Sequence, residues 1–93
     1  MEGKVVIVRT VSAGVHVGTL VSRTGREVTL RNATRVWHWH GAYTLHELAL
    51  RGAAQEDTMI SAAVPEILLT EAIEIILCTQ EASENLLHSR WPA

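Results

Sequence analysis

Two indoles and a guanidinium occupy every second position of the segment Arg35 to His40. In an extended chain three side chains project to the same side: Arg35, Trp37 and Trp39. Two indoles at this spacing form a platform on which a flat ring can stack. An arginine beside them can hold a phosphate or a carboxylate through a fork of hydrogen bonds. The segment therefore predicts a contact surface for a flat, anionic ligand, and Gly41 and Ala42 would let the chain turn close to it.

The same tryptophans have two other interpretations. Aromatic residues make up only 4% of the chain and phenylalanine is absent. Trp37 or Trp39 can therefore complete an otherwise aliphatic core. Both can also contact another subunit, because aromatic side chains are enriched at protein interfaces. The sequence leaves pocket, core and interface open.

A second candidate site follows the first predicted strand, from Arg9 to Gly14. Small residues after a strand can leave backbone N–H groups free to cradle an anion, here those of Ser12, Ala13 and Gly14. The side chains of Arg9, Thr10 and Ser12 would add donors. The lysine and the glycine spacing of a P-loop are absent, and a plain hairpin connection explains the same residues.

Histidines and carboxylates offer weaker signals. His38 and His40 lie two residues apart, but a third metal ligand at a usual spacing is missing. Glu66, Glu71 and Glu74 have no nucleophile–base pair or catalytic motif beside them, so a solvated face explains them better. We therefore expect no metal, no cofactor and no catalytic residue, and a binding protein rather than an enzyme.

Length and charge limit the class of protein. The chain has 93 residues, enough for one domain spanning 1–93, and oligomer formation often compensates for so small a core. The net charge of −2 gives no overall field that would attract nucleic acid. Up to Arg35, however, six basic residues outweigh two acidic ones, and after it two basic residues face eight acidic ones. The first part can therefore present a local basic patch to an anion.

Two further features bear on the environment of the protein. Cys78 is the single cysteine, which excludes an internal disulfide, and its apolar surroundings predict a buried, inert thiol. Nothing resembles a signal peptide, and the longest apolar run is too short to span a membrane. We expect a cytoplasmic protein.

The elements that position these residues are predicted to be mainly β. Residues 4–10 read as a strand buried on both faces, and residues 15–23 as a second, with a bulge or close backbone approach at Gly18. A tight turn leads to a third strand over residues 27–31, which completes an antiparallel meander. Asn32 to Thr34 then interrupts, and residues 35–40 read as a separate strand.

Helix caps mark the rest of the chain. Thr44 and Glu47 form the signature of a capping box for a short helix that Gly52 ends. Residues 59–64 read as a short strand, and residues 66–78 as one or two strands, although residues 71–74 would also suit a helix. Thr79 caps a final helix, after which residues 89–93 fray unless Trp91 docks. The expected fold is α+β, mainly β: a small antiparallel sheet or partly open barrel with one short internal helix and a C-terminal helix.

Most of the chain resembles an uncharacterised family of small proteins from tailed bacteriophages and prophages. The matching segments are Val6-Ile7-Val8-Arg9-Thr10-x-Ser12-Ala13-Gly14-Val15, Gly18-x-Leu20, Leu30-Arg31-Asn32-Ala33, Arg35-x-Trp37-x-Trp39-x-Gly41-Ala42, Leu45-x-x-Leu48-Ala49 and Leu69-Thr70-Glu71-x-x-Glu74-Ile75-Ile76-x-Cys78-Thr79. The family supplies no activity to transfer, but phage origin implies a class of tasks. Some small phage proteins are sponges, which sequester the nucleotide-derived signals of bacterial immune systems such as CBASS and Thoeris. They are typically β-rich homo-oligomers with ligand pockets between subunits.

By analogy with such sponges, we expect an anti-defence protein that binds a cyclic nucleotide or a cyclic ADP-ribose-like molecule in the cytoplasm of the infected host. Trp37 and Trp39 would stack on bases, while Arg9, Arg35 and the amides of residues 12–14 would hold phosphates. One alternative is a protein–protein interaction or structural module that uses the tryptophan-rich strand. Another is a single-strand nucleic-acid binder, which the negative charge disfavours. An enzyme is the remaining class.

Overall fold

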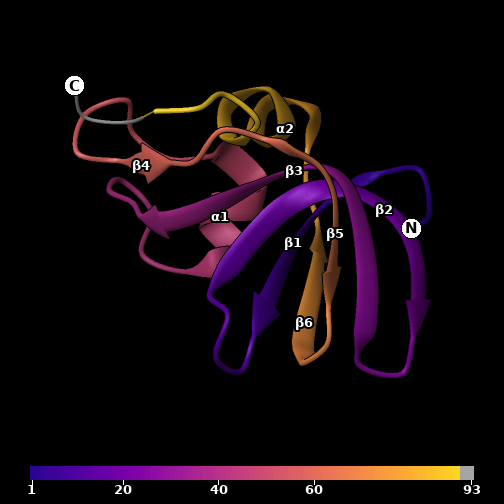
Figure 1. Cartoon of the computed structure of the whole chain (residues 1–93). Helices are drawn as coiled ribbons and strands as arrows, with labels where there is room; N and C mark the ends of the chain where they lie inside the picture. The colour runs from indigo at the N-terminus through magenta and orange to yellow at the C-terminus, as the bar shows by residue number, and fades with distance from the viewer. Residues whose placement is uncertain (91–93) are drawn as a thin grey trace.

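The computed structural model describes residues 1–90, which form six strands and two short helices (Figure 1). In chain order they are β1 (Val5–Thr10), β2 (Val15–Thr24), β3 (Glu27–His38), α1 (Leu45–Arg51), β4 (Met59–Ile60), β5 (Val64–Leu69), β6 (Ala72–Leu77) and α2 (Gln80–Leu86). The prediction of a mainly β fold with an internal and a C-terminal helix is confirmed.

All strand pairs are antiparallel, and they form an open sheet in the order β4-β3-β2-β1-β6. The long strand β3 pairs with β2 along one edge, and its other edge is shared by β5 and β4. The turn from β5 to β6 consists of only Thr70 and Glu71, yet these two strands lie at opposite ends of the strand order. The sheet must therefore curl until its ends meet at this turn, as Figure 1 shows.

The curl creates two apolar cores. The inner core, inside the curl, comprises Val6, Val8, Leu20, Val28, Leu30, Ala33, Leu69 and Ala72. The helix-side core, between the sheet and the helices, comprises Ile7, Val17, Val36, Leu48, Ala49, Ala53, Ile60, Ala82 and Leu86. Strand β1 supplies residues to both, because successive side chains of a strand point to opposite faces. Its predicted burial on both faces is confirmed.

The third strand is longer than the sequence predicts. The expected break at residues 32–34 is wrong, because a bulge, and not a loop, lies there: Asn32 adopts a left-handed conformation with φ +52. The β2–β3 register shifts between Val17 and Thr19, so Gly18 lies beside the irregularity. A Cβ on Gly18 would come within 3.1 Å of Ala33. The predicted bulge or close approach at Gly18 is confirmed, and β3 continues to the tryptophan-rich segment without interruption.

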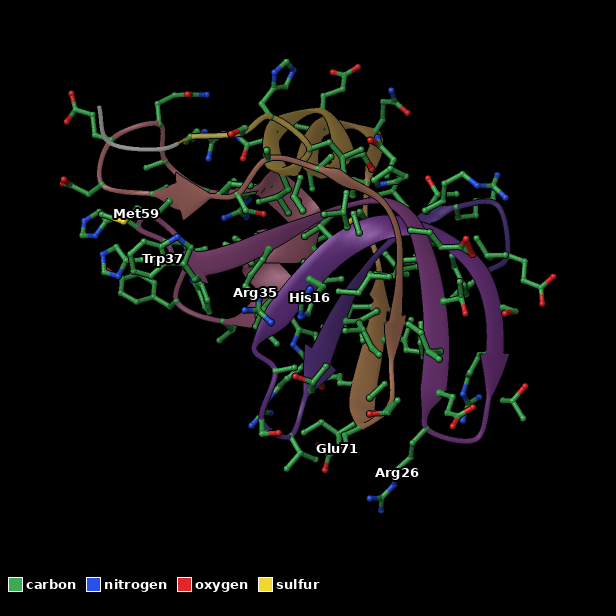
Figure 2. The ribbon with its side chains drawn as sticks, in the orientation of Figure 1. His16, Arg26, Arg35, Trp37, Met59 and Glu71 are labelled. Carbon is green, nitrogen blue, oxygen red and sulfur yellow. The ribbon has the colours of Figure 1, made fainter. Side chains whose placement is uncertain are left out.

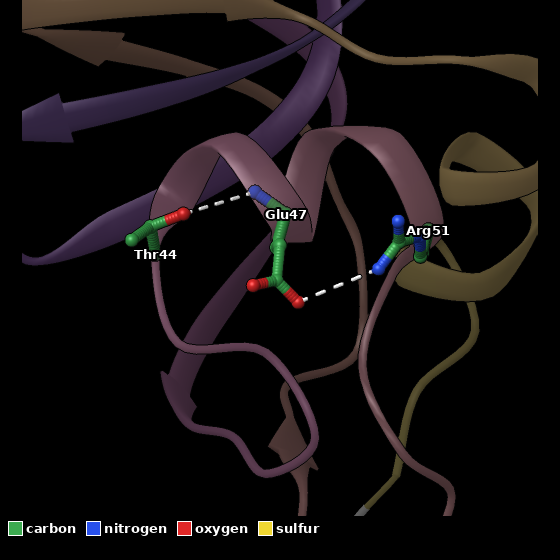
Figure 3. A network of polar contacts seen from close by, with 3 residues as sticks. All are labelled: Thr44, Glu47 and Arg51. Carbon is green, nitrogen blue, oxygen red and sulfur yellow. Dashed lines mark hydrogen bonds and ion pairs between the residues drawn. The ribbon is translucent and has the colours of Figure 1, made fainter.

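Both predicted helix starts are confirmed. The Thr44 hydroxyl oxygen accepts a hydrogen bond from the Glu47 backbone N–H at 3.2 Å, which caps α1 (Figure 3). The Glu47 carboxylate points along the helix to Arg51, 3.7 Å away. Gly52 ends the helix with φ +78. In the same way the Thr79 hydroxyl oxygen accepts from the Ala82 N–H at 3.1 Å at the start of α2.

The segment between the helices differs in detail from the prediction. The strand expected over residues 59–64 is only Met59–Ile60, because Val64 already belongs to β5. Residues 66–78 contain two strands, and the helical alternative for residues 71–74 is not adopted. Fraying was expected for residues 89–93. This expectation is wrong for Arg90, whose backbone exchanges hydrogen bonds of 2.8 and 2.9 Å with Ile60. Trp91 lies outside the described residues.

Candidate ligand-binding site

A hollow of about 370 Å³ lies where the end of β3 meets the loop between β1 and β2. Its lining includes Ser12, Ala13, Gly14, Arg35, Trp37 and Trp39. The two segments meet because β2 pairs with β3, which places His16 opposite Arg35 and Val15 opposite Val36. Most members of the two predicted sites therefore belong to a single site.

Arg35 is held in place by several contacts, although its side chain is exposed. Its guanidinium Nη2 donates to the carbonyl oxygen of Ala13 at 2.7 Å. Its backbone N–H donates to the Ser61 hydroxyl at 2.8 Å, and the Ser61 N–H donates back to the Arg35 carbonyl at 3.0 Å. Among residues 1–90 no carboxylate forms an ion pair with Arg35. The remaining guanidinium N–H groups can therefore receive an anion.

His16 lies beside Arg35 and is buried (Figure 2). Its Nε2 is 2.8 Å from the Ala13 carbonyl oxygen, and since a carbonyl only accepts, Nε2 must carry a proton. Burial lowers the pKa of His16; the hydrogen bond to Ala13 opposes this effect, and the positive charge of Arg35 reinforces it. His16 is therefore a neutral donor that shares one acceptor with Arg35.

The loop between β1 and β2 uses most of its own donors. The buried Thr10 hydroxyl donates to the Gly14 carbonyl oxygen and accepts from the Ala13 N–H, both at 2.8 Å. The Ser12 hydroxyl donates to Glu71 Oε1 at 3.1 Å. These contacts are those of a well-satisfied hairpin connection. Among the residues predicted to hold an anion, Arg35 is therefore the best placed.

The two tryptophans differ in their surroundings. Trp37 is 51% exposed, and Figure 2 shows it near Met59 of β4. The β3–β4 register shifts at Trp37, between Val36 and His38, which disturbs the simple alternation of faces. Trp39 is half-buried and packs against the helix-side core while also lining the hollow. Trp37 is thus the better stacking surface, and Trp39 serves both core and hollow.

Four predicted residues lie apart from the lining of the hollow: Thr10, which is bonded within its own loop, Arg9, Gly41 and Ala42. Arg9 is an exposed residue of β1, opposite Val15 and Glu74. Gly41 has φ +84, and a Cβ there would come within 3.0 Å of Ala54. Ala42 packs against the helix-side core. Gly41 and Ala42 therefore turn the chain from β3 towards α1, and the close approach predicted at this turn is to another backbone segment.

The described part of the chain gives less support to a metal site, a nucleophilic cysteine or a membrane-spanning helix. No cluster of three metal-ligating side chains occurs among residues 1–90. Burial raises the pKa of the Cys78 thiol to about 11, which makes it a poor nucleophile at neutral pH. No helix within residues 1–90 is long and apolar enough to cross a membrane.

Sequence reasoning missed His16, Ser61 and Glu71 as neighbours of the site. Their contribution depends on the register of β2 against β3 and on the position of the β5–β6 turn. No local motif carries that information, because each of these residues is remote in sequence from the site residue it contacts.

Comparison with known proteins identifies a family. No curated protein and no solved structure matches the chain. A family model described as a domain of unknown function (DUF6948) matches residues 3–86, from just before β1 to the last residue of α2. The chain belongs to the DUF6948 family of domains of unknown function.

Proposed function

We propose that this protein binds and sequesters a nucleotide-derived signal without turning it over. The observation that carries the proposal is the hollow that Arg35, Trp37 and Trp39 share. A flat base can stack on an exposed indole, and such a stack contributes about 1–3 kcal/mol. The Arg35 guanidinium, fixed by Ala13, can hold a phosphate at the same time.

Two contacts favour binding over turnover. The Ser12 hydroxyl donates to the Glu71 carboxylate at 3.1 Å, a contact that ties the β1–β2 loop to the β5–β6 turn. The buried His16 uses its Nε2 proton in a hydrogen bond to a backbone carbonyl. The groups nearest the ligand are therefore engaged in structural hydrogen bonds, which is consistent with a holding site.

The biological role in this proposal is that of a phage anti-defence sponge. The ligand would be a cyclic nucleotide or a cyclic ADP-ribose-like signal of a CBASS or Thoeris system, captured in the cytoplasm of the infected host. The resemblance to phage and prophage proteins and the small, mainly β fold support this role. In a homo-oligomer, each assembly would carry one copy of the site for every subunit.

Isothermal calorimetry with cyclic dinucleotides and cyclic ADP-ribose tests the proposal. We expect one of these molecules to bind the wild-type protein, and Trp37→Ala to weaken binding by about tenfold or more, because one base stack is lost. Tyr43→Ala is the matched control, since Tyr43 is 96% exposed and is not part of the lining. Folded wild-type protein that binds none of the molecules would refute the proposal.

The exposure of Trp37 and Tyr43 also favours a second candidate, a protein-interaction module. In that case the nucleotide titrations would be silent. Trp37→Ala and Tyr43→Ala would both weaken a complex with a phage or host protein. The two candidates therefore differ in how they respond to Tyr43→Ala.

A further inference from the structure

Arg35 lines a second hollow besides the one that it shares with the tryptophans. The first, here called the tryptophan hollow, measures about 370 Å³. The second, here called the aliphatic hollow, measures about 230 Å³, and its lining includes Ala33, Val64 and Ile67. Along β3 the aliphatic hollow uses residues before Arg35, and the tryptophan hollow uses residues after it. Arg35 therefore stands at the boundary between the two hollows.

The strand register explains why the aliphatic hollow forms there. Ala33 packs in the inner core, and Arg35 follows it by two residues on β3, so the two side chains share a face of the sheet. Val64 of β5 lies opposite Ala33, and His16 of β2 lies opposite Arg35. Residues that lie directly opposite in an antiparallel pair also share a face. Because Ile67 packs against the inner core from β5, the aliphatic hollow continues the inner face of the sheet.

The contacts of Arg35 leave most of its guanidinium accessible to both hollows. Nη2 donates to the Ala13 carbonyl oxygen at 2.7 Å, which uses one of the five N–H groups. Figure 2 shows Arg35 between Trp37 on one side and His16 on the other. Among residues 1–90 no carboxylate forms an ion pair with this guanidinium. A phosphate bound to its remaining N–H groups would therefore have one hollow on each side.

The size and the walls of the aliphatic hollow indicate what it can hold. Its volume is below the roughly 300–1,000 Å³ of ordinary ligand pockets, so it serves as a subsite of the neighbouring hollow. Val64 is 43% exposed and Ile67 is half-buried, so both side chains present apolar surface. Such walls can cover the face of a flat ring whose charged linker lies on Arg35.

We infer that the ligand is a dinucleotide, with one base on Trp37, a linking phosphate on Arg35 and the second base in the aliphatic hollow. This inference rests on the proposed function and narrows its ligand to cyclic dinucleotides. Cyclic ADP-ribose has a single base and would leave the aliphatic hollow unfilled. A mononucleotide would likewise occupy the tryptophan hollow alone.

Calorimetry that compares cyclic di-AMP and cyclic di-GMP with AMP, GMP and cyclic ADP-ribose tests this inference. We expect one cyclic dinucleotide to bind wild-type protein about tenfold more tightly, or better, than its mononucleotide, because the second base adds contacts. Val64→Trp, which fills the aliphatic hollow, should remove this difference and leave the affinity for the mononucleotide unchanged.

Leu68→Trp is the matched control, because it introduces the same side chain on the same strand. Leu68 is 56% exposed and lies opposite Thr29, whose neighbours on β3 point into the inner core, so Leu68 belongs to the other face of the sheet. This variant should bind both kinds of nucleotide as wild-type protein does. Circular dichroism establishes that both variants are folded.

Methyl NMR of wild-type protein provides a second measurement, which needs no substitution in the hollow. The cyclic dinucleotide should shift the methyl resonances of Val64 and Ile67 together with the indole resonance of Trp37. The mononucleotide should shift the indole resonance and leave the two methyl groups unaffected.

Three results would overturn the inference and leave the proposed function in place. They are equal affinities for the dinucleotide and the mononucleotide, tightest binding of cyclic ADP-ribose, and a dinucleotide complex in which the Val64 and Ile67 methyl resonances do not move. In each of these cases Trp37→Ala would still weaken binding. Folded wild-type protein that binds none of the molecules would refute the proposed function and the inference together.

Discussion

His16 and Arg35 share one acceptor, the carbonyl oxygen of Ala13. The two nitrogens that reach this oxygen are 3.5 Å apart. They can approach so closely because His16 is neutral, and a protonated imidazole would repel the guanidinium. The orientation of Arg35, the cation that lines the hollow, therefore depends on the protonation state of a buried histidine.

This arrangement predicts a pH dependence of stability. Because the pKa of His16 is lowered in the folded protein, the unfolded chain binds a proton more readily below the ordinary value of 6.5. The contribution of His16 to the free energy of unfolding is fully present above that value. It is lost as the pH falls from that value through the lowered pKa of the folded protein. Urea unfolding at neutral pH and at about pH 5 should show the decrease.

His16→Gln should reduce the part of that decrease due to His16, because glutamine can donate to Ala13 but does not titrate in this range. The exposed residue His46 provides the control substitution, His46→Gln. An equal acid sensitivity in wild-type protein and in His16→Gln would contradict the assignment.

The sequence anticipated the meeting of Arg35, Trp37 and Trp39 because alternation along a strand is a local property. It left open whether a tryptophan completes the core, as Trp39 partly does, and it did not anticipate the register shift at Trp37. It also overestimated the free donors of the loop, since Thr10 and Ser12 find their partners only after the hairpin and the β5–β6 turn have formed.

At the scale of elements, two side chains bind the end of α1 to α2: the Thr79 hydroxyl donates to the Leu50 carbonyl oxygen at 2.7 Å, and Asn85 contacts Ala53. Asn85 accepts from the Ala53 N–H and donates to the Ala53 carbonyl oxygen, both at 3.0 Å. The helix can end there because Gly52 has φ +78 and leaves room for Asn85. A Cβ on Gly52 would lie only 2.5 Å from the Asn85 side chain.

Gly52→Ala should therefore destabilise the protein by more than backbone strain alone. With φ +78 and ψ −166, Gly52 has a backbone conformation in which a side chain costs roughly 1–3 kcal/mol, and loss of the Asn85 contacts adds about 1–3 kcal/mol. Gly25→Ala is the control, because Gly25 has φ +59 but open space around its Cα. Urea unfolding that finds equal losses for the two variants would contradict the packing argument.

The helices and their caps were predictable because a capping residue and a terminating glycine act within one helical turn. The continuity of β3 was not predictable, because residues of the types Asn32, Ala33 and Thr34 occur both at strand bulges and in loops. The neighbouring strand β2 decides between them by continuing its hydrogen bonds past the irregularity.

At the scale of the whole molecule, the two cores share β1. Ile7 packs in the helix-side core, and its neighbours Val6 and Val8 pack in the inner core. Damage to either core must therefore disturb the strand that supports the other. The sheet curl that creates this arrangement depends on pairing between remote segments, and the sequence left open whether it forms an open sheet or a partial barrel.

Leu30→Ala in the inner core and Leu48→Ala in the helix-side core should each lower the free energy of unfolding by about 2–5 kcal/mol. Because the cores are coupled, each variant should still unfold in one transition, with tryptophan fluorescence and far-ultraviolet circular dichroism in agreement. Two separate transitions in either variant would show that the cores are independent.

Capture and release tests the central claim directly. The claim is that the hollow lined by Arg35, Trp37 and Trp39 holds a nucleotide-derived signal intact. The protein is incubated with cyclic dinucleotides and cyclic ADP-ribose, and unbound molecules are removed. The protein is then denatured, and the mass of the released molecule is measured by mass spectrometry. We predict one nucleotide of unchanged mass, recovered from wild-type protein and largely lost with Trp37→Ala. Recovery of no nucleotide from folded protein, or of a hydrolysed product, would contradict the claim.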